Sequence, residues 1–342
     1  MVILRYVKHR ALLLCIVLLA ACNKGVDFIP LSPETTLSVL PDSSFLGSCR
    51  GFQYVDGELY VLDIDRRSVL VFNEELSTYS SIANGGNGPG ELLAPFSFFA
   101  SEDSVYIMDF GSFSMKVFSD GHFIRSRSFP FQVWDSRFVI DSSLCIFPFK
   151  NQEYNVVKMD MTGDDISPLS EVDRFPTPMK TVTMNRVSVL RYRDGYLVLP
   201  SSLDWVKILD GEGAELRSFN LCSNKVYSIN EQYSHKADSE QKSAYTLNGD
   251  GYIKDDTLYL LIPEYGDHFK KNRIMMLDLQ SGEILPTVLV LKGSSYSSFC
   301  VGNNHLFVSM MITRRLNAMR CRIIGFVKIR SSTGSGCTRG EC

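Results

Sequence analysis

A short apolar segment recurs six times along the chain, and each copy has the length and continuous hydrophobicity of a buried β-strand. The copies occupy residues 59–63, 105–109, 144–148, 196–200, 258–262 and 306–310. Their first residues lie roughly 50 positions apart on average, which is the length of a β-propeller blade. A polar turn precedes every copy, for example Asp56-Gly57 before the first and Asn303-Asn304 before the sixth. The pattern predicts a repeated β unit.

A second apolar strand follows five of the copies, at 68–73, 114–119, 155–160, 205–210 and 273–278. Turns and short closing strands come next, and the stretch before each copy supplies a fourth strand. Four antiparallel strands in about 40–50 residues form one propeller blade. The predicted fold class is therefore all-β, a six-bladed β-propeller with four antiparallel strands per blade. Two separate β-sandwiches are the alternative, because they also consist of short strands joined by regular turns.

The innermost strands of the predicted blades are expected at 48–54, 95–100, 135–140, 187–193, 244–248 and 297–302. They carry Arg50, Arg137, Arg191 and Arg193, with Asp135 as the one carboxylate. Hard metal ions need several oxygen ligands, so this set predicts no metal site. A mildly electropositive channel would instead attract an acidic peptide or glycan. Alternatively, the arginines pair with neighbouring acids or lie on the rim.

A glycine-rich segment lies between the first and second repeats. It contains the candidate turn residues Gly85, Gly86, Gly88, Pro89, Gly90 and Glu91. Glycine adopts positive φ without steric cost and proline fixes φ, so the segment predicts one sharp turn whose amides bind the Glu91 carboxylate. An anion-binding nest is the alternative. The Lys-Ser/Thr pair of a P-loop is missing.

The Gly-x-Gly-Pro-Gly-Glu signature at 86–91 resembles that of the TolB-like six-bladed propeller lipoproteins. The Leu-Tyr-Val-x-Asp and Val-x-Val-Phe phrases of the first two repeats are also similar to this family and, more distantly, to NHL-type blades. The likeness is sharp over 57–118 and looser afterwards. It implies the propeller fold and a lipid anchor, and it implies little about activity.

The N-terminus indicates export. A basic segment at 5–10 precedes an apolar run at 11–19, which is shorter than the roughly 20 residues of a membrane-spanning helix. This is the pattern of a signal peptide. Leu-Ala-Ala-Cys at 19–22 resembles the lipobox of bacterial lipoproteins, in which Cys22 is acylated and becomes the first residue. Asn23 is typical of passage to the outer membrane, with either leaflet open. Ordinary signal cleavage and an uncleaved anchor are the alternatives.

Composition narrows the classes of function. The chain is 45% hydrophobic and 21% charged, which suits a folded domain with a large core. Its net charge of −3 gives no support for nucleic-acid binding. The cysteines after Cys22 form no CxxC pair and are mostly far apart, so we expect small buried side chains in place of a disulfide framework.

The sequence contains no recognisable catalytic motif. The four histidines after the signal segment are not spaced like metal ligands on one element, and no Gly-x-Ser-x-Gly elbow occurs. Residues 248–256 resemble a calcium loop, but Tyr252 stands where an oxygen ligand is needed, so a turn before the fifth repeat is expected. We therefore predict no catalytic residue, no cofactor and no metal.

Two long connections are candidates for a binding surface, because loops on a rigid scaffold commonly carry function. Residues 220–243 are polar and are expected to include a short helix, and 264–272 separate two central strands. Their aromatic side chains would anchor a partner, unless both are simple solvated loops. With the channel arginines, the candidate binding residues are Arg50, Arg137, Arg191, Tyr227, Tyr233, Tyr265 and Phe269.

The C-terminal segment departs from the repeat. Beyond Met310 the second strand of the sixth repeat is not recognisable, and the chain ends in a basic tail. One hypothesis is that the natural end is lost through a reading-frame change, which would leave the sixth blade incomplete with unpaired edges. The expected organisation is a signal peptide over 1–21, a lipidated N-terminus and linker over 22–40, the propeller over 41–330 and a disordered tail over 331–342.

These observations predict a membrane-anchored lipoprotein of the cell envelope, in the outer membrane, that acts as a binding or scaffold propeller without chemistry of its own. Its partners would be the membrane, through the N-terminal lipid, and an envelope protein, peptide or glycan. No nucleic-acid partner is expected. The alternative is a propeller hydrolase or lyase acting on glycans or lactones, because catalytic triads are spatial and escape inspection of a sequence.

Overall fold

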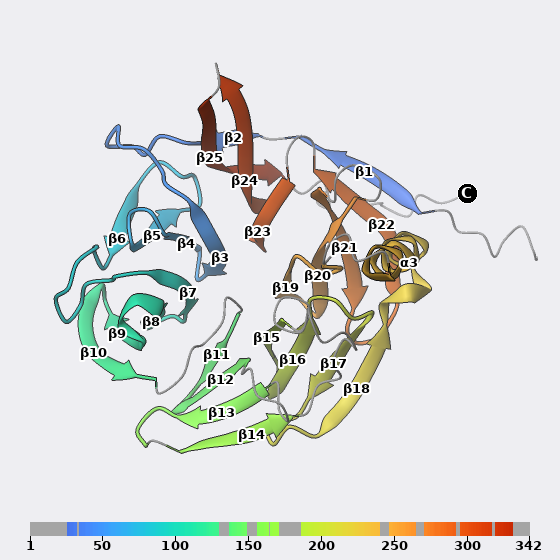
Figure 1. Ribbon diagram of the computed structural model, residues 1–342, viewed down its shortest axis with the longest axis horizontal. Helices are drawn as coiled ribbons and strands as arrows, with labels where there is room; N and C mark the ends of the chain where they lie inside the picture. The colour runs from blue at the N-terminus through green and yellow to red at the C-terminus, as the bar shows by residue number, and fades with distance from the viewer. Residues whose placement is uncertain are drawn as a thin grey trace, which may run out of the picture.

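Six β-sheets radiate from a common axis in the computed structural model, like the blades of a propeller (Figure 1). The structure describes residues 26–32, 34–129, 137–148, 156–163, 165–170, 186–239, 246–264, 270–291, 295–316 and 319–330, with side chains omitted at 233–239 and 310–330. The predicted all-β, six-bladed propeller is thereby confirmed, and the alternative of two β-sandwiches is wrong.

The first three blades follow chain order from the axis outward. The first contains β3 (Cys49–Val55), β4 (Glu58–Asp63), β5 (Ser68–Asn73) and β6 (Tyr79–Ile82). The second contains β7 (Pro95–Ala100), β8 (Ser104–Asp109), β9 (Ser114–Ser119) and β10 (His122–Ser128), with the 3-10 turn η1 (Phe110–Ser112) after β8. The third contains β11 (Val139–Asp141), β12 (Leu144–Pro148), β13 (Val156–Asp160) and β14 (Ile166–Ser170).

The last three blades have the same order, and the N-terminal segment adds to two of them. The fourth contains β15 (Val187–Tyr192), β16 (Gly195–Pro200), β17 (Trp205–Leu209) and β18 (Glu215–Asn220). The fifth contains β19 (Asp250–Lys254), β20 (Thr257–Pro263), β21 (Lys271–Asp278), β22 (Ile284–Leu291) and, outermost, β1 (Asp27–Leu31). The sixth contains β23 (Ser295–Val301), β24 (His305–Leu316), β25 (Met319–Arg330) and, outermost, β2 (Thr35–Leu37).

The recurrent apolar segments form the second strand of each blade, where neighbouring blades cover both faces. All six residues of β16 are buried, as are five of the six in β4. Six clusters of buried apolar side chains fill the spaces between neighbouring sheets. One of them joins the sixth blade to the first through Phe307 and Phe52, which closes the ring. One blade cannot bury its own faces, so the repeat is stable only as a ring.

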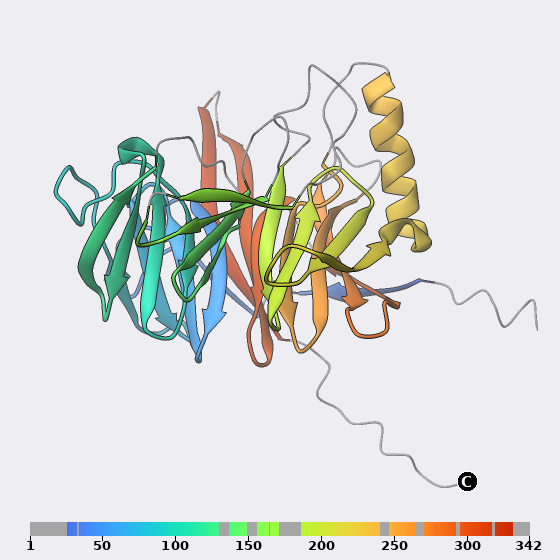
Figure 2. The same ribbon diagram turned by 90° about the horizontal axis from the view of Figure 1, so that it is seen from below.

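Short hairpins join the innermost strands to the second strands on one face of the ring, which is the lower face in Figure 2. Asp56 and Gly57 make the first of these turns with φ of 47° and 84°. Positive φ at both central residues gives a turn that matches the twist of the strands. The innermost strands begin on the opposite, upper face, toward which the end of β24 and the start of β25 also extend (Figure 2).

The predicted linker over 22–40 requires correction, because β1 and β2 lie within it. β1 runs parallel to β22, and β2 runs antiparallel to β25. Four of the five β1 residues are exposed, so no buried face marked this strand in the sequence. Its pairing covers the outer edge of β22, which would otherwise present free backbone groups.

The sixth blade has four strands among the described residues, so the hypothesis of an incomplete blade is also corrected. β25 pairs with β24 along its whole length, and β2 from the other end of the chain completes the sheet. The two ends of the chain therefore close the ring together (Figure 1). Residues 331–342, predicted as a tail, lie outside the described residues.

One helical insertion follows the fourth blade. Residues 221–223 form the 3-10 turn η2 (Leu221–Ser223), and α3 (Lys225–Ser239) follows as a 15-residue helix. The Asn224 side chain accepts the backbone N–H of Val226 at 2.9 Å, a helix N-cap contact. Among the described residues, no helix is long and apolar enough to cross a bilayer.

Two buried aspartates explain the last position of the Leu-Tyr-Val-Leu-Asp phrase. Asp63 Oδ2 accepts the backbone N–H of Gly47 at 2.7 Å, and its Oδ1 accepts those of Asp65 and Arg66 at 3.1 and 3.0 Å. Asp109 in the second blade accepts the N–H groups of Leu93 and Ala94 in the same way. Each carboxylate thereby fixes the segment that enters its blade to the end of the second strand.

We predict that Asp63→Asn lowers the free energy of unfolding by roughly 1–3 kcal/mol, the cost of leaving a buried polar group unpaired. Both Asp63 oxygens accept N–H groups, and an asparagine of the same shape would point its NH2 group at one of these donors. Urea unfolding measures the change. Asp103→Asn, in an exposed hairpin turn, is the control, and an equal effect in both variants would contradict this role.

Candidate functional site

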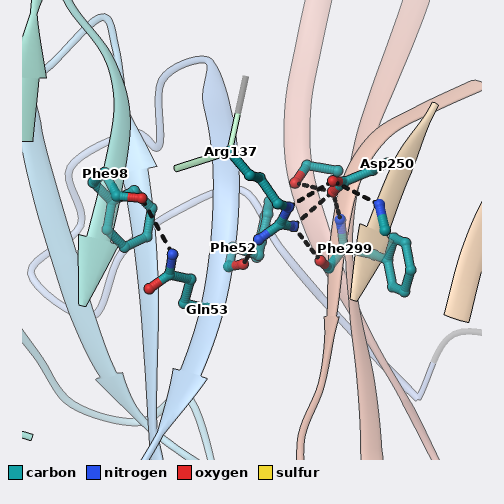
Figure 3. A network of polar contacts seen from close by, with 8 residues as sticks. Phe52, Gln53, Phe98, Arg137, Asp250 and Phe299 are labelled. Atoms are coloured by element: carbon teal, nitrogen blue, oxygen red, sulfur yellow. Dashed lines mark hydrogen bonds and ion pairs between the residues drawn. The ribbon is translucent and has the colours of Figure 1, made fainter. Parts of the chain in front are cut away.

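Arg137 lies at the centre of the ring, two residues before β11. Its Nε and Nη2 atoms each donate to one oxygen of Asp250, on β19, at 2.7 Å (Figure 3). This two-pronged geometry is the strongest form of a guanidinium–carboxylate pair. The side chains are 14% and 9% exposed, so the pair is largely removed from water. It joins the third blade directly to the fifth.

The same guanidinium also contacts the first and sixth blades. Nη1 donates to the carbonyl oxygen of Phe52 at 3.1 Å, and Nη2 donates to that of Phe299 at 3.0 Å (Figure 3). The Arg137 backbone carbonyl accepts the N–H of Val189 in the fourth blade at 3.0 Å. One residue therefore links five of the six blades across the axis.

Gln53, on β3, connects the first blade to the second, the one blade that Arg137 does not contact directly among the described residues. Its side-chain amide donates to the carbonyl oxygen of Phe98 at 3.2 Å (Figure 3). It also accepts the N–H of Ala100 at 2.6 Å, and both partners lie on β7. Gln53 neighbours Phe52, whose carbonyl binds Arg137. The polar contacts at the axis therefore reach all six blades.

The Asp250 carboxylate is fully engaged. Besides Arg137, it accepts the Ser298 hydroxyl at 2.7 Å and the backbone N–H groups of Gly251 and Phe299 at 2.9 and 3.1 Å. Burial opposes the charged guanidinium, but Asp250 outweighs this cost and raises the pKa of Arg137. The two groups have opposite formal charges, so the pair contributes no net charge at the axis.

The Arg137–Asp250 pair divides the channel into two spaces. Above it is a cavity of about 230 Å³ among the beginnings of the innermost strands, which we call the cup. Below it is a second cavity of about 190 Å³, whose wall is mostly apolar and includes Tyr54, Phe138 and Tyr252. The Tyr252 hydroxyl donates to the Tyr54 carbonyl oxygen at 3.2 Å, and burial raises the pKa of Tyr252.

Four cationic side chains line the cup, namely Arg50, Arg137, Arg186 and Lys271. Asp250 is the one acidic side chain among the described residues of its wall, and Arg137 neutralises it. The remaining wall is rich in hydroxyl and amide groups. The cup is therefore an electropositive cavity supported by the rigid inner strands.

The arginines predicted for the channel do not all reach the cup. Arg50 and Arg137 line it, whereas Arg191 borders the lower cavity and pairs there with Asp141. Arg193 pairs with Asp256 at 3.0 Å. Asp135 lies outside the described residues. Pairing with neighbouring acids, the alternative interpretation, therefore applies to Arg137, Arg191 and Arg193.

Among the described residues, no binding surface of the predicted aromatic side chains is found. Tyr227 is fully buried, with its hydroxyl 3.0 Å from the Leu203 carbonyl oxygen and 3.1 Å from Asn248 Oδ1, so its prediction as a binding residue is wrong. Tyr233 belongs to α3, but its side chain is outside the description. Tyr265 and Phe269, together with the lipidation residue Cys22, also lie outside the described residues.

The glycine-rich segment folds back on itself between the first two blades. Glu91 Oε2 accepts the Gly88 N–H at 2.7 Å, and the buried Lys116 ammonium donates to the Pro89 carbonyl oxygen at 3.1 Å. None of the four glycines, all described, has positive φ. A Cβ on Gly86 would lie 2.1 Å from Glu91 Oε2, and one on Gly90 would lie 2.8 Å from Phe123 Cβ, so a larger residue at either position would force its neighbour to shift. The carboxylate of Glu91 occupies the position that an external anion would need.

Three lining residues of the cup, Asp250, Arg186 and Lys271, were not among the site residues expected from the sequence. Residues 248–256 were interpreted as a turn, but β19 begins at Asp250, so the fifth inner strand lies six residues later than predicted. A signal for Arg186 was present, because Arg50, Arg137 and Arg186 all stand near the start of an innermost strand. Lys271 lies at the start of β21, the third strand of its blade, yet it lines the cup, and no feature of the sequence pointed to a third strand.

The described residues contain no group of His, Cys, Asp and Glu side chains placed to hold a metal ion. The segment that resembles a calcium loop is the innermost strand β19, and its Asp250 is engaged by Arg137. His305 lies on the lower face, 3.2 Å from Glu74 and 3.6 Å from Glu34, away from the cup. The chemistry that the cup offers is the binding of a negatively charged, hydrogen-bonding group.

Solved structures with the same fold come from proteins of low sequence identity. An exported protein of Bacteroides fragilis is 14% identical, with a TM-score of 0.58 over 89% of this chain and 100% of the other. A member of the DUF4221 family from Bacteroides vulgatus is 13% identical, with a TM-score of 0.56 over 87% and 97%. A streptogramin B lyase is 10% identical, with a TM-score of 0.50 over 86% and 97%. These similarities support the fold alone.

No curated protein matches the chain. Residues 19–257, which include the first four blades, the helical insertion and the start of the fifth blade, match a protein family described as a 6-bladed beta-propeller. This match covers more than half of the chain and agrees with the six sheets of the structure. The chain therefore belongs to this family of six-bladed β-propellers.

Proposed function

We propose that this protein is a lipid-anchored binding propeller of the bacterial cell envelope, which holds an anionic ligand in the cup and performs no chemistry on it. The observation that carries the proposal is the charge of the cup. Four cationic side chains and one acidic side chain are found among the described residues of its wall. A concave wall with excess positive charge raises the local concentration of anions and speeds their capture.

The rigidity of the cup supports a binding role. Its cationic residues come from the first, third, fourth and fifth blades, and the contacts of Arg137 hold these blades together at the axis. A site that is already formed loses less conformational entropy when a ligand binds. Five hydrogen bonds to the Asp250 carboxylate leave it engaged in the floor rather than free to act as a general base.

The proposed anchor is a lipid on Cys22. The sequence at 19–22 supports it, and the fold neighbour from Bacteroides fragilis is described as exported. β1 begins at Asp27, five residues after Cys22. Such a spacer spans at most roughly 18 Å, so the propeller would remain close to the membrane surface.

Lipid anchoring predicts that Cys22→Ser moves the protein from the membrane fraction to the soluble fraction of a bacterial envelope preparation, because all the proposed acyl chains are attached to this one residue. Metabolic labelling with palmitate should be lost in the same variant. Cys15→Ser, the matched change inside the apolar run, should leave both unaltered. Membrane retention and labelling of the Cys22→Ser protein would contradict the anchor.

If the ligand binds in the cup, its capture should depend on the cationic residues of the cup. The lipidated protein is used to capture partners from detergent-solubilised envelopes, beside a variant with Arg186→Gln and Lys271→Gln. We expect this variant to lose most of the captured material, because hydrogen bonds to charged groups contribute roughly 1.5–3 kcal/mol each. Arg125→Gln, at an exposed position on β10, is the control.

Two outcomes would contradict the proposal. Equal capture by the cup variant and the control would show that the ligand binds outside the cup. Release of a chemically altered ligand by the wild-type protein, in the presence or absence of calcium, would favour the hydrolase or lyase alternative.

A further inference from the structure

The lower cavity of the channel differs in chemistry from the cup. Its volume is about 190 Å³, and the first five blades contribute to its wall. Val55, Arg191 and Ile253 line it, and each is the last or the second-to-last residue of its innermost strand. Because these strand ends form the hairpins of the lower face, the cavity faces the lower end of the channel (Figure 2).

The charges in the wall of the lower cavity are compensated. Arg137 and Arg191 are the two charged side chains among its described lining residues. Arg137 pairs with Asp250, and Arg191 pairs with Asp141. A charged ligand would lose its hydration on entering, while both cations of the wall already have a carboxylate partner. The cavity therefore favours a neutral ligand.

The guanidinium group of Arg137 forms the top of this cavity. The N–H bonds of a guanidinium lie in its plane, and those of Arg137 point to acceptors on the fifth, first and sixth blades (Figure 3). The plane therefore lies across the channel, and Arg137 lines the cup on one side and the lower cavity on the other. The flat face of a guanidinium stacks favourably on an aromatic ring.

Aromatic side chains surround the space below this face, and their neighbours hold them in place. Phe99 and Phe138 line one side, with ring centroids 6.3 Å apart and planes inclined by 44°. Tyr54 stacks on Phe307 at 6.0 Å, and its carbonyl oxygen accepts the Tyr252 hydroxyl. Aromatic rings attract a further ring in offset or edge-on contact. The wall is thus already formed for a flat ring.

The size of the cavity fits one such ring. An apolar cavity of roughly 150 Å³ is enough to bind benzene. The volume of about 190 Å³ leaves room for one small substituent, and the occupant gains dispersion contacts on every side. We infer that the lower cavity is a second binding site, for a small neutral molecule with a single aromatic ring that stacks beneath Arg137. This site is separate from the cup and does not rest on the anionic ligand proposed there.

NMR titration of the whole protein with three probes tests the inference. p-Cresol is neutral and flat, 4-methylcyclohexanol has the same carbon and oxygen skeleton in saturated form, and benzoate is flat but charged. We expect p-cresol to bind at least about five-fold more tightly than 4-methylcyclohexanol, because only the aromatic ring stacks on the guanidinium. We expect it to bind about ten-fold more tightly than benzoate, because the carboxylate must be desolvated.

Two variants locate the ligand. Ile253→Trp fills the mouth of the cavity and should reduce p-cresol binding at least about ten-fold. Ile284→Trp, at a half-buried position on β22 of the same blade, is the matched control and should leave binding unchanged. Phe99→Leu keeps an apolar wall without its ring and should weaken p-cresol binding by about five-fold. Urea unfolding of each variant separates loss of binding from loss of folding.

The guanidinium is tested by the variant with both Arg137→Met and Asp250→Leu, which removes the two charges together. It should bind p-cresol and 4-methylcyclohexanol equally; Phe99→Leu and Ile253→Trp decide the matter if this variant does not fold. Equal binding of these two probes by the wild-type protein, or absence of binding by every probe, would overturn the inference. So would p-cresol binding that Ile253→Trp leaves intact. None of these results bears on capture through the cup, which is measured separately.

Discussion

The architecture of this propeller depends on one buried ion pair at its axis. Arg137 binds Asp250 through two hydrogen bonds and reaches the carbonyl oxygens of Phe52 and Phe299 with two of its other N–H groups. Burying two charges is costly, and only close geometry with further hydrogen bonds compensates for it. Ser298 and two backbone N–H groups supply those bonds to Asp250. The blades are therefore fixed relative to one another at the point where their inner strands come closest.

The same pair determines what the channel can bind. It lies between an upper, electropositive cup and a lower, mostly apolar cavity, and Arg137 lines both. It engages the Asp250 carboxylate, and cationic side chains outnumber acidic ones among the described residues of the wall of the cup. A structural contact thus produces the feature on which the proposed binding function rests.

The fold could be predicted because burial in a propeller repeats along the chain. Second strands such as 59–63 are covered on both faces, so they appear in the sequence as continuous apolar runs. β1 and β2 could not be predicted in this way, because they are held by backbone pairing at sheet edges and β1 buries almost nothing. Asp250 was missed because Gly249 and Gly251 give its segment the appearance of a turn, whereas both glycines serve close packing: a Cβ on Gly251 would lie 2.6 Å from Leu199 Cδ2. Partners across an axis, such as residues 137 and 250, leave no trace in local sequence.

A double-mutant cycle on the axial pair tests this account most directly. Unfolding free energies are measured by urea titration for Arg137→Met, Asp250→Leu and the variant that carries both. Each single change leaves a buried charge without its partner and should cost about 3–5 kcal/mol, and the double variant should lose less than the sum by more than about 1 kcal/mol. Single effects that are small and simply add would show that Arg137 and Asp250 do not hold the blades together.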